Sequence, residues 1–436
     1  MSDVSDEASA SASASPGSYH SGSTHAYDHE PFETFRYKVG ELARSICDCE
    51  VTSLKRIEGG GGAYNRVVFA ELTKGGESIQ GVFRFRRLNE GAAESGESLF
   101  DPRILDQVAV QQHLTDWRLP LPRLLAYDAS SENPAGLPYT FQEFSDGKAI
   151  DEVYEEMNLY ARLSVARELA QFLVRCETVR FEKSGNLVAD HELRPPAKGS
   201  YLSDAESAAV KGVVVPFPDV FGRKHISDFN LDIIVSNMVR ERAANPVSGA
   251  TDTWSRVYDV EQDMRRRGYY DLPGPNASLT RNSVLFHTDL SVSNILAKAN
   301  GDGSWRIDKV IDWDGAQSVP AVLARKPPVW LWDFDCDHEV DVDKPGKNDP
   351  GRGILDPDEH AIRQAFETTL VEGLRELYPG YDLATYRQEA YGKGWWVRWM
   401  TRFVMTRSAM TRSASDPDYV EMFVREWRAH CEEMDG

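Results

Sequence analysis

One stretch, Val284–Asp314, constrains the fold of this 436-residue chain more than any other. It contains three short apolar runs, at residues 284–286, 295–296 and 307–311. The sequence Asn-Gly-Asp-Gly at 300–303 separates the second run from the third, and two strands joined by such a turn form a β-hairpin. The hairpin places the segment before the second run beside the end of the third. Two carboxylates, Asp289 and Asp312, and one amide, Asn294, therefore converge at the edge of a small sheet.

These converging groups suit phosphoryl transfer. A kinase needs a carboxylate that accepts the proton of the attacking hydroxyl, and oxygen ligands that hold Mg²⁺ on the nucleotide phosphates. Kinase catalytic loops have the pattern His-Arg-Asp-Leu-x-x-x-Asn. Residues 287–294 read His-Thr-Asp-Leu-Ser-Val-Ser-Asn, with Thr288 as the only departure. The alternative is a plain turn in which Asp289 caps backbone amides, and the hairpin and Asp312 that follow disfavour it.

With these residues, the segment resembles the catalytic core of the aminoglycoside phosphotransferase family, and most closely its fungal branch of kinase-like small-molecule phosphotransferases. The resemblance covers residues 50–335. It implies an α+β, two-lobed protein-kinase-like fold with a small antiparallel-sheet N-lobe and a larger, mainly helical C-lobe. ATP and Mg²⁺ are the implied cofactors. The implied roles are catalytic base for Asp289, support of the loop for His287, and metal binding for Asn294 and Asp312.

A second motif, at residues 54–87, has the pattern of a strand pair that binds a nucleotide. Four glycines at 59–62 precede the first apolar strand, and glycines let a backbone approach phosphates closely. Glycine runs also form flexible turns, and the Gly-Lys-Ser/Thr of a Walker A loop does not follow. The resemblance implies nucleotide contacts from this motif and from the hinge between the lobes, at Gly60, Gly61, Gly62, Asn65, Arg84, Gln142 and Phe144.

The second strand of this pair, which follows the turn at residues 74–76, lacks the lysine that holds the α- and β-phosphates in kinases. Arg84 aligns with that position, and Arg86 is an alternative because both side chains lie on the same face of a strand. Arginine stays charged and can bind two phosphate oxygens, but it is not interchangeable with lysine. A solvated edge strand is the structural alternative. On the next predicted helix, Gln107 stands where the resemblance implies a glutamate that pairs with this cation, and Asp106 is adjacent. Glu97, upstream of the helix, is an alternative partner for the cation.

The chain is expected to have three parts. Residues 1–30 are rich in Ser and Ala and are expected to be a disordered tail. Residues 31–144 are expected to form the N-lobe with the nucleotide clasp, and residues 145–436 the helical C-lobe with the catalytic loop and the acceptor site. Apolar periodicity predicts helices at 35–47, 104–114, 159–181, 229–238, 254–264, 357–378 and 384–412. Residues 191–218 are predicted to be loop, and Trp395, Trp396 and Trp399 to belong to the core rather than to a ligand site.

Composition limits the partners. The chain has 69 acidic and 49 basic residues, a net charge of −20, which disfavours nucleic acid and anionic membranes. Its sequence has no apolar run long enough to span a membrane and no features of a secretory signal. The five cysteines are few and odd in number, which fits a reducing compartment, so a cytoplasmic protein is expected.

The acceptor is expected to be a small molecule with a hydroxyl group. Residues 317–320 and 327–332 resemble the family's segment around the acceptor site. The chain lacks Ala-Pro-Glu there, and Thr288 replaces the arginine with which protein kinases bind a phosphorylated activation loop. Acidic residues at 333–343 form either a solvated loop or a pocket wall for an amine-bearing substrate. We therefore predict an ATP- and Mg²⁺-dependent kinase of a small-molecule hydroxyl. The alternatives are a catalytically weak nucleotide-binding protein of the same fold and a protein kinase.

Overall fold

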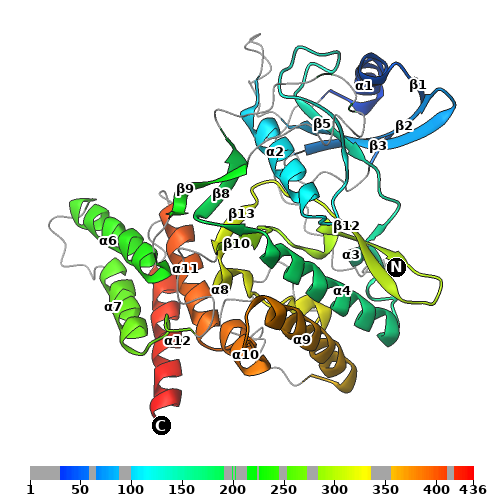
Figure 1. The fold of residues 1–436 in the computed structure, drawn as a ribbon. Coiled ribbons are helices and arrows are strands. Elements are labelled where there is room, and N and C mark those ends of the chain that lie inside the picture. The colour runs from blue at the N-terminus through cyan, green and yellow to red at the C-terminus, as the bar shows by residue number, and fades with distance from the viewer. Residues whose placement is uncertain are drawn as a thin grey trace, which may run out of the picture. The chain divides into compact units, whose positions relative to one another are not determined.

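The computed structural model describes residues 30–57, 65–87, 100–190, 199, 202, 214–222, 225–244, 253–272, 283–334, 355–409 and 417–436. The chain, drawn as a ribbon in Figure 1, forms two compact units. The smaller unit consists of Met1–Asp101, Ala126–Gln142 and Lys198–Tyr201. The larger unit consists of Pro102–Leu125, Glu143–Ala197 and Leu202–Gly436. The predicted tail and the glycine run at 59–62 lie outside the described residues.

An antiparallel sheet forms the smaller unit. Its strand order is β1-β2-β3-β5-β4, with the bounds Glu50–Arg56, Asn65–Lys74, Glu77–Arg86, Tyr139–Glu143 and Leu124–Asp128 in that order. Along β3 the side chains alternate, so that Phe83 and Phe85 are buried while Arg84 and Arg86 occupy the other face. Helix α1 (Phe32–Cys47) covers the buried face, where Phe35 packs edge-on against Phe85 with ring centroids 5.1 Å apart.

One glycine in this sheet is required by packing. Gly81 in β3 faces Phe141 of β5, and a Cβ at this position would collide with the Phe141 ring. Without that Cβ, Phe83 stacks on Phe141 with their centroids 4.1 Å apart. The close approach holds β5, and hence Gln142 at its end, against the middle of the sheet.

The larger unit is mainly helical and contains two further sheets. One has the order β7-β10-β13-β8-β9, with the bounds Arg180–Phe181, Ser283–Phe286, Gln317–Pro320, Ser184–Ala189 and Val214–Gly222. The other has the order β12-β11-β6, with the bounds Trp305–Val310, Ile295–Ala299 and Lys148–Ala149. The main helices are α2 (Pro102–Asp116), α4 (Leu159–Thr178), α6 (Ile226–Ala244), α7 (Thr253–Arg266), α9 (Pro357–Leu377), α10 (Leu383–Ala390), α11 (Lys393–Ala409) and α12 (Pro417–Asp435).

The two longest core helices, α4 and α9, begin at side-chain caps. Asn158 accepts a hydrogen bond from the backbone N–H of Ala161 at the start of α4. Asp356 and Glu359 form a capping box at the start of α9. The helices pack against each other closely enough that Gly373 of α9 meets Val174 of α4. Short helical turns at Ile150–Val153 (α3), Ala321–Ala324 (α8), Val292–Asn294 (η3) and Val329–Leu331 (η4) complete this region.

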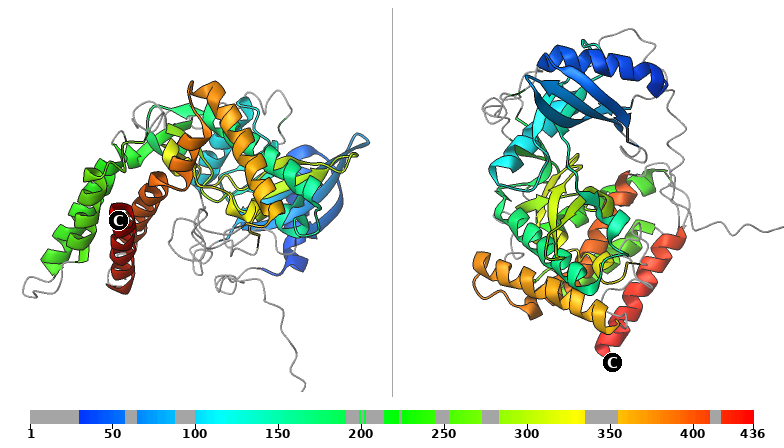
Figure 2. Two further views of the ribbon diagram at one scale, coloured as in Figure 1. Left: turned by 90° about the horizontal axis from the view of Figure 1, so that it is seen from below. Right: turned by 90° about the vertical axis from the view of Figure 1, so that its right-hand side faces the viewer.

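A second cluster of buried side chains joins α6, α7, α11 and α12, which lie side by side in Figure 2. Trp395, Trp396 and Trp399 are all at most 6% exposed, which confirms that they belong to the core. Trp396 packs against Trp427 of α12 with ring centroids 5.0 Å apart. The C-terminal helices are therefore an integral part of the larger unit.

The predicted fold class is confirmed: a small unit with an antiparallel sheet accompanies a larger, mainly helical one. Each predicted helix is present, although residues 384–412 contain two helices rather than one. Strand β9 starts at Val214 inside the predicted loop, and α12 is not among the predicted helices. Helix α2 belongs to the larger unit. Within the described residues, no helix has the length and apolar character needed to cross a membrane.

Candidate active site

The candidate catalytic loop begins where β10 ends, and His287 is its first residue. Because β10 is paired on both sides, by β13 and β7, the chain delivers His287 to the interior, where it is 5% exposed. Its Nδ1 accepts a hydrogen bond from the backbone N–H of Asp289 at 3.2 Å, and its Nε2 lies 2.9 Å from the carbonyl oxygen of Ile311. An N–H only donates and a carbonyl only accepts, so the imidazole carries its proton on Nε2 and is neutral.

Electrostatics around His287 agree with this geometry. Burial lowers its pKa below the ordinary value of 6.5 and keeps the ring neutral. The bond to Ile311 and the carboxylates of Asp312, Asp289 and Asp314 act in the opposite direction and are weaker. These three carboxylates therefore lie near one imidazole, although two segments of the chain supply them. Trp313 closes the site, with its ring centroid 4.6 Å from that of His287.

Asn294 fixes the orientation of Asp289. The helical turn η3 ends at Asn294, whose Nδ2 donates to the backbone oxygen of Asp289 at 2.9 Å and to its Oδ2 at 3.1 Å. Asn294 is 8% exposed, whereas Asp289 is exposed. The carboxylate that the sequence suggests as the base is therefore open to an incoming molecule and is held by a residue that is itself buried.

The predicted hairpin is confirmed, and it brings Asp312 to the loop. Strands β11 and β12 pair from Ile295↔Val310 to Ala299↔Trp305. Beyond the paired region, the backbone N–H of Ile311 donates to the carbonyl of Asn294 at 2.9 Å. The next residue, Asp312, has a φ of 63°, a left-handed conformation that is uncommon for a residue other than glycine. Such backbone strain is concentrated at functional sites, where the surrounding structure holds it in place.

The donor set fits a magnesium ion. Both hydrogens of the Asn294 amide group are donated to Asp289. The atom of this side chain that can coordinate a cation is therefore Oδ1. Asp312 supplies a carboxylate one residue beyond the bond that joins the two segments. Among the described residues, no group of three or more His, Cys, Asp or Glu side chains could hold a metal by itself. Magnesium commonly binds one or two carboxylates and fills its remaining positions with water and phosphate oxygens.

The residues proposed for nucleotide binding are divided between the two units. Asn65 begins β2 and Arg84 lies in β3, opposite Val67, both in the smaller unit. Gln142 is the last residue of the smaller unit before the chain enters the larger one, and Phe144 follows in the larger unit. Gly60, Gly61 and Gly62 are outside the described residues.

Arg86, the alternative to Arg84 in the sequence, has an acidic partner in the structure. Arg86 forms an ion pair with Asp101, with Nε 3.4 Å from Oδ2, and the Asp101 side chain is 9% exposed. This partner, fifteen positions further along the chain, could not be assigned from the sequence. Arg86 thus has a structural partner within the smaller unit. The assignment of the phosphates to Arg84 stays a prediction.

Asp106 also has a structural partner. On α2, its Oδ1 accepts a hydrogen bond from the backbone N–H of Ala189 at the end of β8, at 3.0 Å. This bond anchors α2 to a sheet of the larger unit. Gln107, the residue at the position of the expected glutamate, is half-buried beside it.

The segment that follows Gln142 is tied to the hairpin formed by β11 and β12. Ser145 Oγ donates to Asp308 of β12 at 2.7 Å, and Lys298 of β11 forms ion pairs with Asp308 at 3.1 Å and with Asp146. The segment that enters the larger unit after Gln142 and the hairpin that ends near Asp312 are thus parts of one polar assembly.

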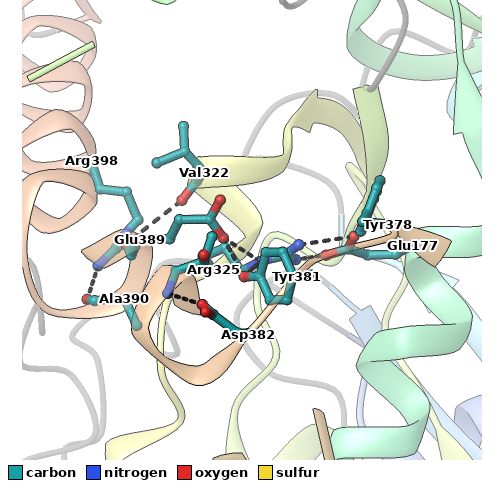
Figure 3. A network of polar contacts seen from close by, with 10 residues as sticks. Glu177, Val322, Arg325, Tyr378, Tyr381, Asp382, Glu389, Ala390 and Arg398 are labelled. Carbon is teal, nitrogen blue, oxygen red and sulfur yellow. Dashed lines mark hydrogen bonds and ion pairs between the residues drawn. The ribbon is translucent and has the colours of Figure 1, made fainter. Parts of the chain in front are cut away.

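Sequence reasoning missed a buried ionic network centred on Arg325, which Figure 3 shows. Its Nη2 lies 3.1 Å from Glu177 Oε2, and its Nε lies 3.0 Å from Glu389 Oε2 and 3.1 Å from the Tyr381 hydroxyl. Arg325 is 3% exposed and joins the segment that follows Asp314 to α4 and α10. The partners are 148 and 64 positions away in sequence, and no local pattern could have indicated them.

The fold is of the kinase-like class, and its candidate site has an exposed carboxylate, Asp289, beside the end of a hairpin. The chain belongs to the phosphotransferase enzyme family (APH), whose family model matches residues 54–322. A comparison with curated proteins gives no match.

Solved structures similar to this chain include three kinases. The GDP complex of wild-type aminoglycoside 2'-phosphotransferase-IIIa is 14% identical, with 91% of this chain and 98% of that chain covered and a TM-score of 0.45. Choline kinase from Cryptosporidium parvum Iowa II is 12% identical, with 88% and 90% covered and a TM-score of 0.41. The streptomycin–ATP–APH(2")-IIa ternary complex is 13% identical, with 91% and 99% covered and a TM-score of 0.38.

Proposed function

We propose that this protein transfers the γ-phosphoryl group of ATP to a hydroxyl group of a small molecule. One observation carries the proposal: Asn294 and His287 together hold Asp289 exposed, oriented and beside the segment that ends at Asp312. Membership of the phosphotransferase family and the nucleotide complexes among the similar kinases support it.

Asp289 is the proposed base. Its carboxylate orients the acceptor hydroxyl and takes its proton while the hydroxyl oxygen forms a bond to the γ-phosphorus. The bond between that phosphorus and the oxygen bridging it to the β-phosphate breaks, and ADP leaves. Catalysis of this kind is mostly positioning and charge stabilisation. His287 contributes by position alone, because its two ring nitrogens are occupied by Asp289 N–H and the Ile311 carbonyl.

Mg²⁺ would be held by Asn294 Oδ1 and the Asp312 carboxylate, and when bound it neutralises charge on the β- and γ-phosphates. We assign the phosphates to Arg84, Asn65 and the glycines at 60–62, and the adenine edge to the backbone at Gln142 and Phe144. We also propose a cytoplasmic location. Within the part of the chain that the structure describes, the four cysteines, Cys47, Cys49, Cys176 and Cys431, are free thiols, which suits a reducing compartment.

The test is a thermal unfolding experiment with Mg²⁺–ATP. A ligand that binds only the folded state raises the melting temperature by mass action. We expect a rise with Mg²⁺–ATP that is reduced when EDTA is present. Asp312→Asn should abolish the magnesium dependence, whereas Asp259→Asn, which changes an exposed aspartate on α7, should leave it intact. The absence of any shift at millimolar Mg²⁺–ATP would contradict the proposal.

Turnover is tested by supplying hydroxylated small molecules, including aminoglycosides and amino alcohols, and measuring ADP. A protein that binds Mg²⁺–ATP and consumes none with any acceptor would be a nucleotide-binding protein of this fold. Phosphorylation of protein hydroxyls and of no small molecule would identify a protein kinase.

A further inference from the structure

The catalytic loop forms one wall of a cavity of about 160 Å³ inside the larger unit. The other walls come from α4, the segment 324–330, α9 and α10. Thr288 and Leu290, the two neighbours of Asp289, both line the cavity, although Asp289 itself does not. Consecutive Cα atoms are 3.8 Å apart, so this wall is within one residue of the proposed base on either side.

The deeper lining of the cavity is apolar. It includes buried side chains from α4, α9, β10 and the segment 324–330, among them Phe172, Cys176, Leu285, Val329, Phe366 and Leu370. Two buried charged residues, Arg325 and Glu177, also line it, but they pair with each other, as Figure 3 shows. The remaining charged residue in the wall, Lys326, is exposed to solvent. A ligand therefore meets a mainly apolar surface, a buried charge pair that is already satisfied, and the polar side chains of the loop, His287, Thr288 and Ser291.

The size of the cavity matches one small apolar group. An engineered cavity of about 150 Å³ lined by Leu, Ile and Phe stays dry and binds benzene. A dry apolar cavity leaves its lining without contact partners on one side, and a ligand that fills it restores them. Each CH₂ group transferred from water into such a site strengthens binding about fourfold.

We propose that this cavity binds an apolar group of the acceptor, a single ring or a short alkyl chain, and so delivers the acceptor's hydroxyl to Asp289. The inference rests on the proposed phosphotransfer, and it specifies an apolar primary alcohol as the substrate class. A molecule anchored between α4 and segment 324–330 contacts the loop at Thr288 and Leu290. A hydroxyl on a short spacer from the anchored group then extends to the exposed carboxylate between them.

Binding to the full-length protein without nucleotide tests the geometry. The probes are benzyl alcohol, 2-phenylethanol and 3-phenylpropanol, each compared with the alkylbenzene of the same chain length, and affinities are measured by NMR titration. We expect the alkylbenzenes to bind, and the alcohol with the matching spacer to bind about tenfold more tightly than its alkylbenzene, because it gains a hydrogen bond to a carboxylate. This advantage should disappear in Asp289→Ala, while the alkylbenzenes still bind.

Two leucines of α4 provide a matched pair of variants. Leu173 and Leu163 are both partly buried against the same core, but only Leu173 lines the cavity. Leu173→Phe fills the cavity and should weaken alkylbenzene binding more than tenfold, whereas Leu163→Phe should not change it. If Leu173→Phe fails to fold, Leu173→Ala replaces it: this variant enlarges the cavity and should shift the preference from benzene towards naphthalene.

Three results decide whether the cavity binds an apolar group of the acceptor. Failure of the alkylbenzenes to bind both the natural protein and Leu173→Ala overturns the proposal. So does binding in which no spacer gives the hydroxyl an advantage that depends on Asp289, because the cavity is then separate from the reaction. Binding with that advantage supports it. If the advantage is present and the protein neither binds Mg²⁺–ATP nor consumes ATP, the phosphotransferase assignment fails while the alcohol-binding cavity stands.

Discussion

The side-chain amide of Asn294 donates a hydrogen bond to the carboxylate of Asp289, with Nδ2 3.1 Å from Oδ2. In the proposed mechanism, one residue orients the base with its amide nitrogen and holds the cation with its amide oxygen. The proposed base and the proposed metal site are thus coupled through a single side chain. A substitution at Asn294 would disturb both, so substitutions at Asp289 and Asp312 are needed to separate them.

The substitution Asp289→Asn should preserve the structure of the loop and greatly reduce the rate of phosphoryl transfer. The new amide can present its oxygen to Asn294 Nδ2, so the fold is kept, but it cannot accept a proton. General-base groups typically contribute about 10²–10⁴-fold. We expect kcat to fall by that factor, about 3–5 kcal/mol of transition-state stabilisation, with little change in ATP affinity. Steady-state kinetics and ATP titration measure the two quantities. Loss of ATP binding would mean that Asp289 is a metal ligand.

His287→Leu should lower both stability and kcat. The substitution leaves the Asp289 N–H and the Ile311 carbonyl without their partner, and each unsatisfied buried group costs about 1–3 kcal/mol. We expect the free energy of unfolding to fall by about 2–6 kcal/mol at pH 8. His360→Leu, which changes an exposed histidine on α9, is the control and should have little effect.

The effect of His287 depends on pH in a defined direction. Its pKa is lowered by burial, so below about pH 6.5 the unfolded chain takes up a proton that the folded chain does not. The stabilisation is thus complete above pH 6.5 and is lost as the pH falls. The difference in stability between the natural protein and His287→Leu should therefore narrow between pH 7.5 and pH 5. A constant difference would show that the imidazole is not held neutral.

The catalytic segment could be predicted from the sequence because its parts are close together in the chain. Asp289, Asn294 and Asp312 lie within one loop and one hairpin, and the turn and strand patterns suffice to bring them together. No such sequence pattern predicts the left-handed backbone conformation of Asp312. Nor do the ion pairs of Arg325, the partner of Arg86 or the cavity, because each depends on packing between segments that are far apart in sequence.

The helical pattern was informative for the same physical reason. Amphipathic periodicity and spaced tryptophans identified α4, α9 and the core position of Trp399, all of which depend on local repeats. The strand β9 was missed because Pro216 and Pro218 suggest a loop, although its backbone pairs with β8. Helix α12 was not predicted, although its buried residues Val420, Phe423, Val424 and Trp427 recur at helical spacing.

Arg325→Met should destabilise the protein strongly. Without its guanidinium, the carboxylates of Glu177 and Glu389 remain buried at 3% and 0% exposure with no cation between them. Removal of one partner from a buried ionic group typically costs about 3–5 kcal/mol. Chemical denaturation measures the loss. The triple variant with Glu177→Gln and Glu389→Gln removes both carboxylates and should recover part of it, which a simple packing defect around the substituted side chain would not allow.

Glu261 makes stability fall as pH rises near neutrality. Burial raises its pKa to about 7, although Tyr270 and Arg265 bind the carboxylate. Between the ordinary value of 4.5 and about 7, the folded chain holds a proton that the unfolded chain has released. The free energy of unfolding therefore decreases with pH across this window, by about 3 kcal/mol in total.

The test is Glu261→Gln, which stays uncharged at all pH values. The free energy of unfolding of the variant minus that of the natural protein should increase by about 3 kcal/mol between pH 4.5 and pH 7.5. Glu376→Gln, which changes an exposed glutamate on α9, should show no such trend. Parallel pH profiles for the Glu261 variant and the natural protein would disprove the assignment.

Arg84→Ala and Arg86→Ala should have different consequences. Loss of Arg84 should weaken Mg²⁺–ATP binding, with partial recovery in Arg84→Lys if a positive charge is sufficient. Loss of Arg86 breaks the ion pair with Asp101 and should reduce stability more than ATP affinity. Denaturation and ATP titration on both variants distinguish these effects. The opposite result would assign the phosphates to Arg86.

The positive φ at Asp312 limits which substitutions at this position can remove the carboxylate and still preserve the backbone of the loop. Glycine adopts a left-handed backbone freely, and asparagine does so more readily than most residues, whereas other side chains add about 1–2 kcal/mol of strain. The smallest mutational step that silences the site and keeps the loop is therefore to Asn or Gly. A related protein that binds its ligands but has lost catalytic activity is expected to have Asn or Gly at the position of Asp312. A bulky residue at this position would indicate that the loop has a different backbone conformation.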